Sequence, residues 1–209
     1  MDNECARLWV FAYRVNPCPI HRESCDCLLA VGFVVLLGGG LAGCTAEPAP
    51  TPTPSVSAEP EAEPIFASDE EALAAAEDAY QSYVAVLNKI AADHNDGTDR
   101  LSAVATSSYA ADVRKQFADL ESNGLRIVGD TTLDSVRLVE RFGEQGKANV
   151  VVLACIDVTS SRINNARGSD VTPAERANRS AVQATFVSVE PRSADLVLAQ
   201  ESQWVGDYC

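Results

Sequence analysis

The stretch NVVVLACIDVT at residues 149–159 decides the fold class, because nearly every position in it is apolar. A strand with one face in water alternates apolar and polar residues, whereas a strand covered on both faces is a continuous apolar run. We therefore predict a central, doubly covered strand here. The same criteria, with turn residues as boundaries, predict strands at 125–129, 133–141, 181–190 and 196–204, the last two forming a hairpin. The polar segment 160–180 is predicted to be a long loop.

Helices are predicted upstream of these strands. Ser68 and Glu71 fit a capping box, and apolar residues then recur at three- and four-residue spacing up to about residue 92. A short helix near 99–105 and a third helix over 108–123, ended by Gly124, complete the helical part. Helices followed by antiparallel strands predict one α+β domain over residues 69–209, with N-terminal helices packed on one face of the sheet. The expected inward stripe of the first helix is Leu73, Ala76, Tyr80, Tyr83, Val84, Leu87, Ile90 and Ala91.

Residues 1–43 have the features of a lipoprotein signal peptide. Three arginines precede the apolar run LLAVGFVVLL at 28–37, and the segment closes on Leu41-Ala42-Gly43-Cys44. Small residues before a cysteine are typical of a lipobox, so Cys44 is the expected lipidation site and new N-terminus, carrying fatty acyl chains such as palmitate. The alternative is an uncleaved membrane anchor. The run is shorter than the roughly 20 apolar residues that a spanning helix needs, which favours the lipobox.

The N-terminal region before the apolar run is unusually long, and it contains four cysteines and His21. A metal site is one interpretation of these residues. Removal with the leader, or a translation start placed too far upstream, is the favoured one, because no second Cys/His pair at ligand spacing follows. We expect neither a metal nor another cofactor.

Residues 44–68 are predicted to form a tether. They hold six of the ten prolines and several glutamates, and such a segment has too little apolar surface to fold by itself. Residues 44–209 carry 26 acidic and 13 basic residues, a net charge of −13, which argues against nucleic-acid partners. Arginine outnumbers lysine by 13 to 3, the bias of a GC-rich coding sequence. With the lipobox, this predicts the outer face of the cytoplasmic membrane of a high-GC Gram-positive bacterium.

Two thiols remain once Cys44 is acylated, namely Cys155 and Cys209. In an oxidising compartment a disulfide between them is the simple expectation. A reactive-thiol role is the alternative, but neither cysteine lies beside a histidine or a predicted helix start.

The order of elements resembles the nuclear-transport-factor-2-like cone of SnoaL-type and ketosteroid-isomerase-type proteins, and more closely a group of high-GC Gram-positive lipoproteins of that shape. The likeness lies in AYQSY at 79–83, Gly124, ACID at 154–157 and the end of the chain from Thr185 to the closing Asp-Tyr-Cys. It covers roughly residues 69–209. It implies a curved sheet wrapped around the long helix, with a conical pocket that binds small molecules or proteins as readily as it catalyses.

Asp157 is the candidate catalytic residue. Catalytic members of the cone fold use an inward carboxylate as a base and a tyrosine as hydrogen-bond donor, and three helical tyrosines could supply the donor. The favoured interpretation is that Asp157 holds local structure near the end of its strand, because one acid without a positioned partner is weak evidence for catalysis. Other residues that could line a pocket are Gln183, Thr185, Gln200 and Glu201, although strand parity does not say which face is inward.

The sequence therefore predicts a lipid-anchored envelope protein with a non-catalytic domain that binds a ligand or a protein. A pocket enzyme of isomerase or dehydratase type that uses Asp157, and a purely structural envelope protein, are the alternatives. The identity of the ligand or partner, the oligomeric state and the physiological process do not follow from the residues.

Overall fold

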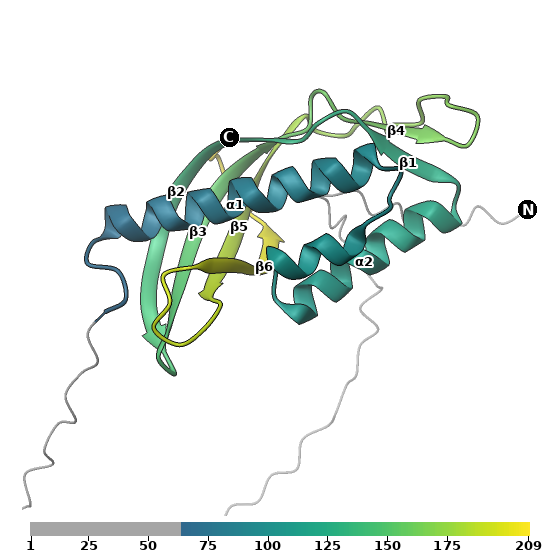
Figure 1. The fold of residues 1–209 in the computed structure, drawn as a ribbon. Coiled ribbons are helices and arrows are strands. Elements are labelled where there is room, and N and C mark those ends of the chain that lie inside the picture. The colour runs from purple at the N-terminus through teal and green to yellow at the C-terminus, as the bar shows by residue number, and fades with distance from the viewer. Residues whose placement is uncertain (1–63) are drawn as a thin grey trace, which may run out of the picture. The chain divides into compact units, whose positions relative to one another are not determined.

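A computed structural model describes residues 64–209 (Figure 1). The predicted signal peptide, Cys44 and nearly all of the tether lie outside these residues. Within the part described, no helix has the length and apolarity needed to cross a membrane.

The helical part begins with α1 (Asp69–Ala92), continues through the short 3-10 helix η1 (Thr98–Ala103) and ends with α2 (Ser107–Ser122). The predicted cap is present in a shifted form: the Glu71 N–H donates to Ser68 Oγ at 3.2 Å, whereas the Glu71 carboxylate accepts at 2.7 Å from the N–H of Ala67, one residue before the N-cap. Gly124 follows α2 with a φ of +67°, the left-handed conformation that ends a helix.

Four antiparallel strands form the main sheet in the order β2-β3-β5-β6. They are β2 (Thr132–Glu144), β3 (Lys147–Asp157), β5 (Arg179–Ser188) and β6 (Leu196–Gln203). The sheet is curved, and α1 lies across one of its faces (Figure 1). We call this the inner face and the opposite one the outer face. The predicted α+β fold, with helices on one face of a curved antiparallel sheet, is confirmed.

The core lies between α1, α2 and the inner face. From α1 it receives the predicted stripe, all of which is buried except the half-buried Leu73, and from β3 it receives Val150, Val152 and Ala154. The intervening residues Leu153 and Cys155 point to the outer face and are buried as well, with exposures of 2% and 0%. The predicted burial of this strand on both faces is therefore confirmed.

A second sheet was not predicted. Strand β1 (Leu125–Val128) pairs with β4 (Arg162–Asn165), which lies in the segment predicted to be a loop. Gly129 separates β1 from β2 with a φ of +88°, and a Cβ there would lie 2.0 Å from the Ser160 carbonyl oxygen. Only glycine allows the two segments to approach so closely, which explains the break between β1 and β2.

Candidate functional site

A carboxylate lies among tyrosines on the inner face of the sheet. Glu201 is on β6 and pairs in register with the buried Ala184 of β5, so its side chain faces the helices. The Tyr80 hydroxyl donates a hydrogen bond to Glu201 Oε2. Tyr80 is fully buried, whereas Glu201 keeps part of its surface in solvent.

Three tyrosines form a chain of ring contacts that leads away from this carboxylate. Tyr80 and Tyr83 of α1 have ring centroids 6.3 Å apart, and Tyr83 lies 6.0 Å from Tyr109 of α2. Phe186 of β5 packs against Tyr80 at 5.4 Å with its ring edge-on. These are the separations at which aromatic pairs stabilise a core. We call Glu201, Tyr80, Tyr83 and Tyr109 the carboxylate–tyrosine cluster.

The electrostatics of the cluster are set by burial. Burial raises the pKa of Glu201, and the hydrogen bond from Tyr80 opposes part of that rise. Burial also raises the pKa of each of the three tyrosines, and the negative charge of Glu201 adds to it in every case. None of the ion pairs found in residues 64–209 includes Glu201. The carboxylate is thus partly withdrawn from solvent and has no positive partner in this part of the chain.

The candidate catalytic residue Asp157 is not part of this cluster. It lies two residues after Cys155 on β3, so its side chain faces the outer side of the sheet, away from the tyrosines. Its Oδ1 accepts from the Thr159 N–H at 2.7 Å, and the hydrogen bonds from Thr159 lower the pKa of Asp157. The structure therefore does not bring Asp157 together with a tyrosine.

Of the four other pocket candidates, only Glu201 faces inward. Gln183 and Thr185 alternate with the core residues of β5 and face outward, and Gln200 pairs with Thr185 on the same side. The inward position of Glu201 depends on a bulge. Leu198 is also in the core, and a regular strand would place residues three apart on opposite faces. The register shift opposite Thr185 and Phe186 inserts one extra residue and turns Glu201 inward.

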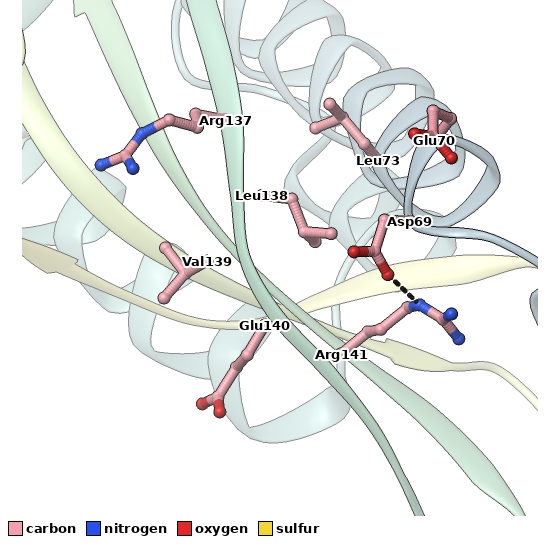
Figure 2. Close-up of a pocket in the computed structure, with 8 residues that line it drawn as sticks. All are labelled: Asp69, Glu70, Leu73, Arg137, Leu138, Val139, Glu140 and Arg141. Atoms are coloured by element: carbon pink, nitrogen blue, oxygen red, sulfur yellow. Dashed lines mark hydrogen bonds and ion pairs between the residues drawn. The ribbon is translucent and has the colours of Figure 1, made fainter.

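The second candidate site is an open cleft beside β2 (Figure 2). It has a volume of about 700 Å³ and lies between the first turns of α1 and the middle of β2. Its apolar lining is Leu73, Leu138 and Val139. Its charged residues are Asp69, Glu70, Arg137, Glu140 and Arg141.

Two contacts fix one wall of this cleft. The Arg141 side chain donates to Asp69 Oδ1 at 2.6 Å and to the Phe66 carbonyl oxygen at 3.0 Å, which holds the start of α1 against β2. Leu138 points toward α1, whereas Arg137 and Val139 project to the other side of the strand (Figure 2). Arg137 there lies over the Tyr208 ring, 5.5 Å from its centroid. The charge of Asp69 is thus paired, while Glu140 forms no ion pair within residues 64–209.

The two edges of the main sheet differ. At the β6 edge, the Thr106 N–H donates to the Leu198 carbonyl oxygen at 2.9 Å, and the Leu198 N–H donates to the Val104 carbonyl oxygen at 3.0 Å. The segment before α2 therefore covers part of this edge. At the other edge, β2 pairs with β3 alone in the portion of the chain described. Strand β2 has 13 residues, and Val139 and Phe142 on it are nearly half exposed. A long open strand of this kind presents unpaired backbone donors and acceptors to solvent.

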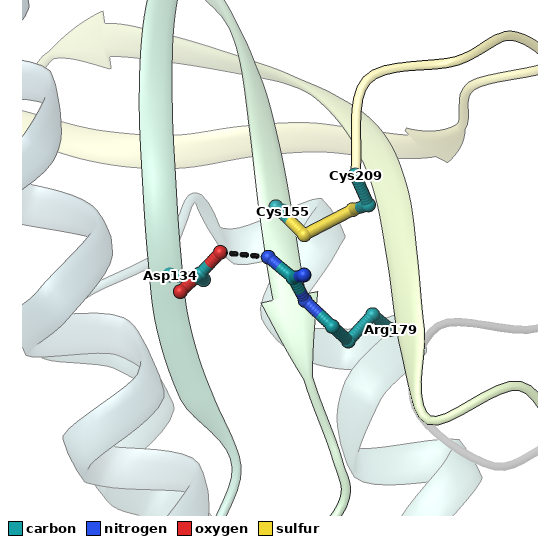
Figure 3. Close-up of a disulfide and its surroundings, with 4 residues drawn as sticks. All are labelled: Asp134, Cys155, Arg179 and Cys209. Carbon is teal, nitrogen blue, oxygen red and sulfur yellow. Dashed lines mark hydrogen bonds and ion pairs between the residues drawn. A yellow bond between two sulfur atoms is a disulfide. The ribbon is translucent and has the colours of Figure 1, made fainter.

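Cys155 and Cys209 form a disulfide with their Cα atoms 5.5 Å apart (Figure 3). The Trp204 N–H donates to the Ala181 carbonyl oxygen, so the last residues of the chain cross the outer face from β5 to β3. An ion pair between Asp134 of β2 and Arg179 of β5 spans β3 beside the disulfide. These bonds hold the C-terminus to the sheet.

The predicted lipidation site Cys44 lies outside residues 64–209. His94, the single histidine of the predicted mature chain, is exposed at the end of α1. Within the described portion, no group of three His, Cys, Asp or Glu side chains has the arrangement of metal ligands.

No protein-family model matches the chain, and no curated protein matches it. Among solved structures, the intermembrane space region of the chloroplast protein ARC6 is 10% identical, covering 64% of this chain and 97% of that one, with a TM-score of 0.48. TraH from the Gram-positive conjugative plasmid pIP501, solved by NMR, is 9% identical, covering 68% and 99%, with a TM-score of 0.37. Identities and TM-scores this low carry no argument about function.

Proposed function

We propose that this protein is a lipid-anchored, non-catalytic binding module of the cell envelope, whose domain takes up an extended segment of a partner protein along β2. The observation that carries the proposal is the open edge of β2 next to a cleft bounded by α1. An edge strand beside a helix suits strand addition, in which backbone hydrogen bonds provide affinity and the groove selects side chains.

The lining of the cleft indicates the chemistry of the partner segment. Leu73 and Leu138 offer an apolar floor for one side chain, Glu70 is acidic, and Asp69 is already paired with Arg141. Glu140 adds an acid on the other side of β2 (Figure 2). The domain as a whole is strongly acidic, which disfavours acidic partners. We therefore expect an extended segment with an apolar residue flanked by lysine or arginine.

The anchor follows from the sequence alone. An acylated Cys44 would attach the chain to the outer face of the cytoplasmic membrane, and a polyproline-like tether over residues 44–68 would span up to roughly 80 Å at about 3.1 Å per residue. The resemblance to lipoproteins with a nuclear-transport-factor-2-like cone supports this arrangement. The test is Cys44→Ser, which should leave the precursor unacylated and uncleaved. Membrane retention of this variant, with the same processing and acyl mass as the wild-type protein, would contradict the anchor.

The binding site is tested with peptides. Ten-residue peptides selected on the purified protein from a random display library should contain an apolar residue next to a basic one. N-methylation of every second peptide amide removes the donors that face β2 in one of the two registers and leaves them in the other. Loss of binding for one register only is expected. Equal binding of both methylated peptides would contradict strand addition.

Charge reversal on β2 supplies a matched pair of variants. Glu140→Lys replaces an acid that lines the cleft, whereas Glu144→Lys makes the same change at the exposed end of the strand, outside the cleft lining. We expect Glu140→Lys to weaken binding of the selected basic peptides about tenfold and Glu144→Lys to change it little. Equal effects would show that only the overall charge matters and would contradict a specific role of the cleft.

A further inference from the structure

The outer side of β2 carries apolar residues that the rest of the sheet leaves open. Val139 and Phe142 have exposed fractions of 49% and 46%, whereas Val151 on the adjacent strand β3 has 5%. Strand β3 has a strand on each side, while β2 has β3 alone within residues 64–209. A further strand at the edge of β2 would therefore cover Val139 and Phe142 in the way that the flanking strands cover Val151.

The register of the sheet places these two residues away from the cleft. Phe142 pairs with Asn149 of β3, which alternates with Val150 of the core and so lies on the outer face. Val139 projects to the side of the strand opposite to Leu138 (Figure 2). A strand added to β2 thus has the cleft on one side and this apolar outer surface on the other.

The end of the chain covers a different part of the outer face. Cys209 is bonded to Cys155, and Tyr208 lies under the Arg137 guanidinium, 5.5 Å from the ring centroid. In the β2–β3 register, the row of Cys155 and the row of Phe142 are six residues of β3 apart, roughly 20 Å at about 3.3 Å per residue. The Cys155–Cys209 disulfide therefore holds the chain end far from Phe142.

Both sides of β2 combine apolar residues with an acid. The cleft side has Leu73, Leu138 and Glu70, and the outer side has Val139, Phe142 and Glu140. The side chains of an added strand alternate between the two sides. A partner segment with apolar residues on one face only would leave the apolar surface on the other side of β2 uncovered.

The bulge in β2 fixes the spacing of the residues that such a segment would use. From Leu138 to Phe142, β2 advances four positions, while β3 advances three, from Val152 to Asn149, because Val139 is the extra residue of a bulge. A regular strand on the open edge would cover this stretch in three positions, as β3 does. Residues three positions apart on a strand point to opposite faces.

We propose that the segment bound by β2 carries two apolar residues three positions apart, one in the cleft beside Leu138 and the other on the outer face beside Phe142. A lysine or arginine next to the first of them lies opposite Glu140, on the outer side. The inference rests on the strand addition proposed above and specifies which segments qualify as partners. Whether the basic residue precedes or follows the cleft residue depends on the direction of the added strand.

Two peptides of identical composition test the spacing. The parent is a ten-residue peptide selected on the purified protein, and it should carry the two apolar residues three positions apart. In the isomer, the apolar residue that faces outward exchanges places with its neighbour on the far side, so that both apolar residues point to one face. We expect the isomer to bind about tenfold more weakly in fluorescence anisotropy titrations, because one apolar side chain is no longer covered.

Variants of the protein locate the second contact. Phe142→Ser and Val139→Ser remove apolar groups that are nearly half exposed, and Val171→Ser makes a matched change at a valine that is 39% exposed outside the main sheet. Phe142→Ser should weaken binding of the parent about tenfold, Val139→Ser should weaken it less, and Val171→Ser should leave it unchanged. A peptide with serine in place of its outward apolar residue should not respond to Phe142→Ser, and this coupling isolates the contact from any general effect on folding.

The outcomes separate this inference from the strand addition on which it rests. Selected peptides that show the expected effect of N-methylation but carry apolar residues on one face only would overturn the spacing and leave strand addition standing. Equal binding of parent and isomer, or unchanged affinity of the parent for Phe142→Ser, would do the same. Failure to select any peptide that binds along β2 would overturn both.

Discussion

Loss of the Cys155–Cys209 disulfide should destabilise the domain substantially. The two cysteines are 54 residues apart, and closing a loop of that length lowers the entropy of the unfolded chain enough to stabilise the folded state by about 4 kcal/mol. This is a large fraction of the roughly 5–15 kcal/mol that stabilises a typical domain. For a domain of this size, about 4 kcal/mol corresponds to a fall in Tm of roughly 8–16 °C.

The variant to measure is Cys209→Ser. Cys209 is the exposed partner, so the substitution removes the cross-link without opening a hole at the buried Cys155. Thermal and urea unfolding are followed by circular dichroism, with and without a reductant. Reduced wild-type protein should match the variant, and reductant should not affect the variant itself. A loss below about 1 kcal/mol would refute the reasoning, because it would mean that the unfolded chain gains little freedom when the link is cut.

The remaining predictions concern the cluster and one glycine. Burial raises the pKa of Glu201 above its usual 4.5, so the folded state binds that proton more tightly than the unfolded state does. The resulting stability is complete below about pH 4 and is lost as the pH rises through the raised pKa. Glu201→Gln should therefore stabilise the protein near pH 7 and change its stability much less near pH 4, as measured by urea unfolding. A larger stabilisation near pH 4 than near pH 7 would contradict the raised pKa of Glu201. Tyr80→Phe leaves the carboxylate without its donor and should cost about 1–3 kcal/mol in the same assay, and a neutral outcome would show that solvent replaces the hydroxyl. Gly129→Ala places a Cβ 2.0 Å from the Ser160 carbonyl oxygen and should cost at least about 2 kcal/mol. Its control, Gly168→Ala, has a similar positive φ and no atom within 4 Å of the new Cβ, so equal losses at the two glycines would refute the close approach.

The long, strongly patterned elements could be predicted from the sequence. The apolar residues of α1 recur at helical spacing, which predicts a helix with one buried face. Those of β3 form a continuous run, which predicts a strand covered on both faces. Strand β4 could not be found in this way. It has four residues, and its pairing with β1 joins segments almost 40 positions apart, which no local pattern records.

The candidate sites were less accessible to sequence reasoning. The tyrosines of α1 follow from helix periodicity, but the inward position of Glu201 depends on a bulge in the β5–β6 pairing that reverses the expected parity. The open edge depends on strand order, which the sequence does not specify. One signal did exist, since the charges of Asp134, Arg137 and Glu140 on β2 are typical of edge strands.

Strand addition to β2 is the central claim about function, and nuclear Overhauser contacts between a selected peptide and the protein test it most directly. The account predicts contacts between peptide backbone protons and those of β2 on both sides of the bulge at Val139, from Arg137 to Arg141. Contacts confined to β6 or to the outer face, with none along β2, would contradict it.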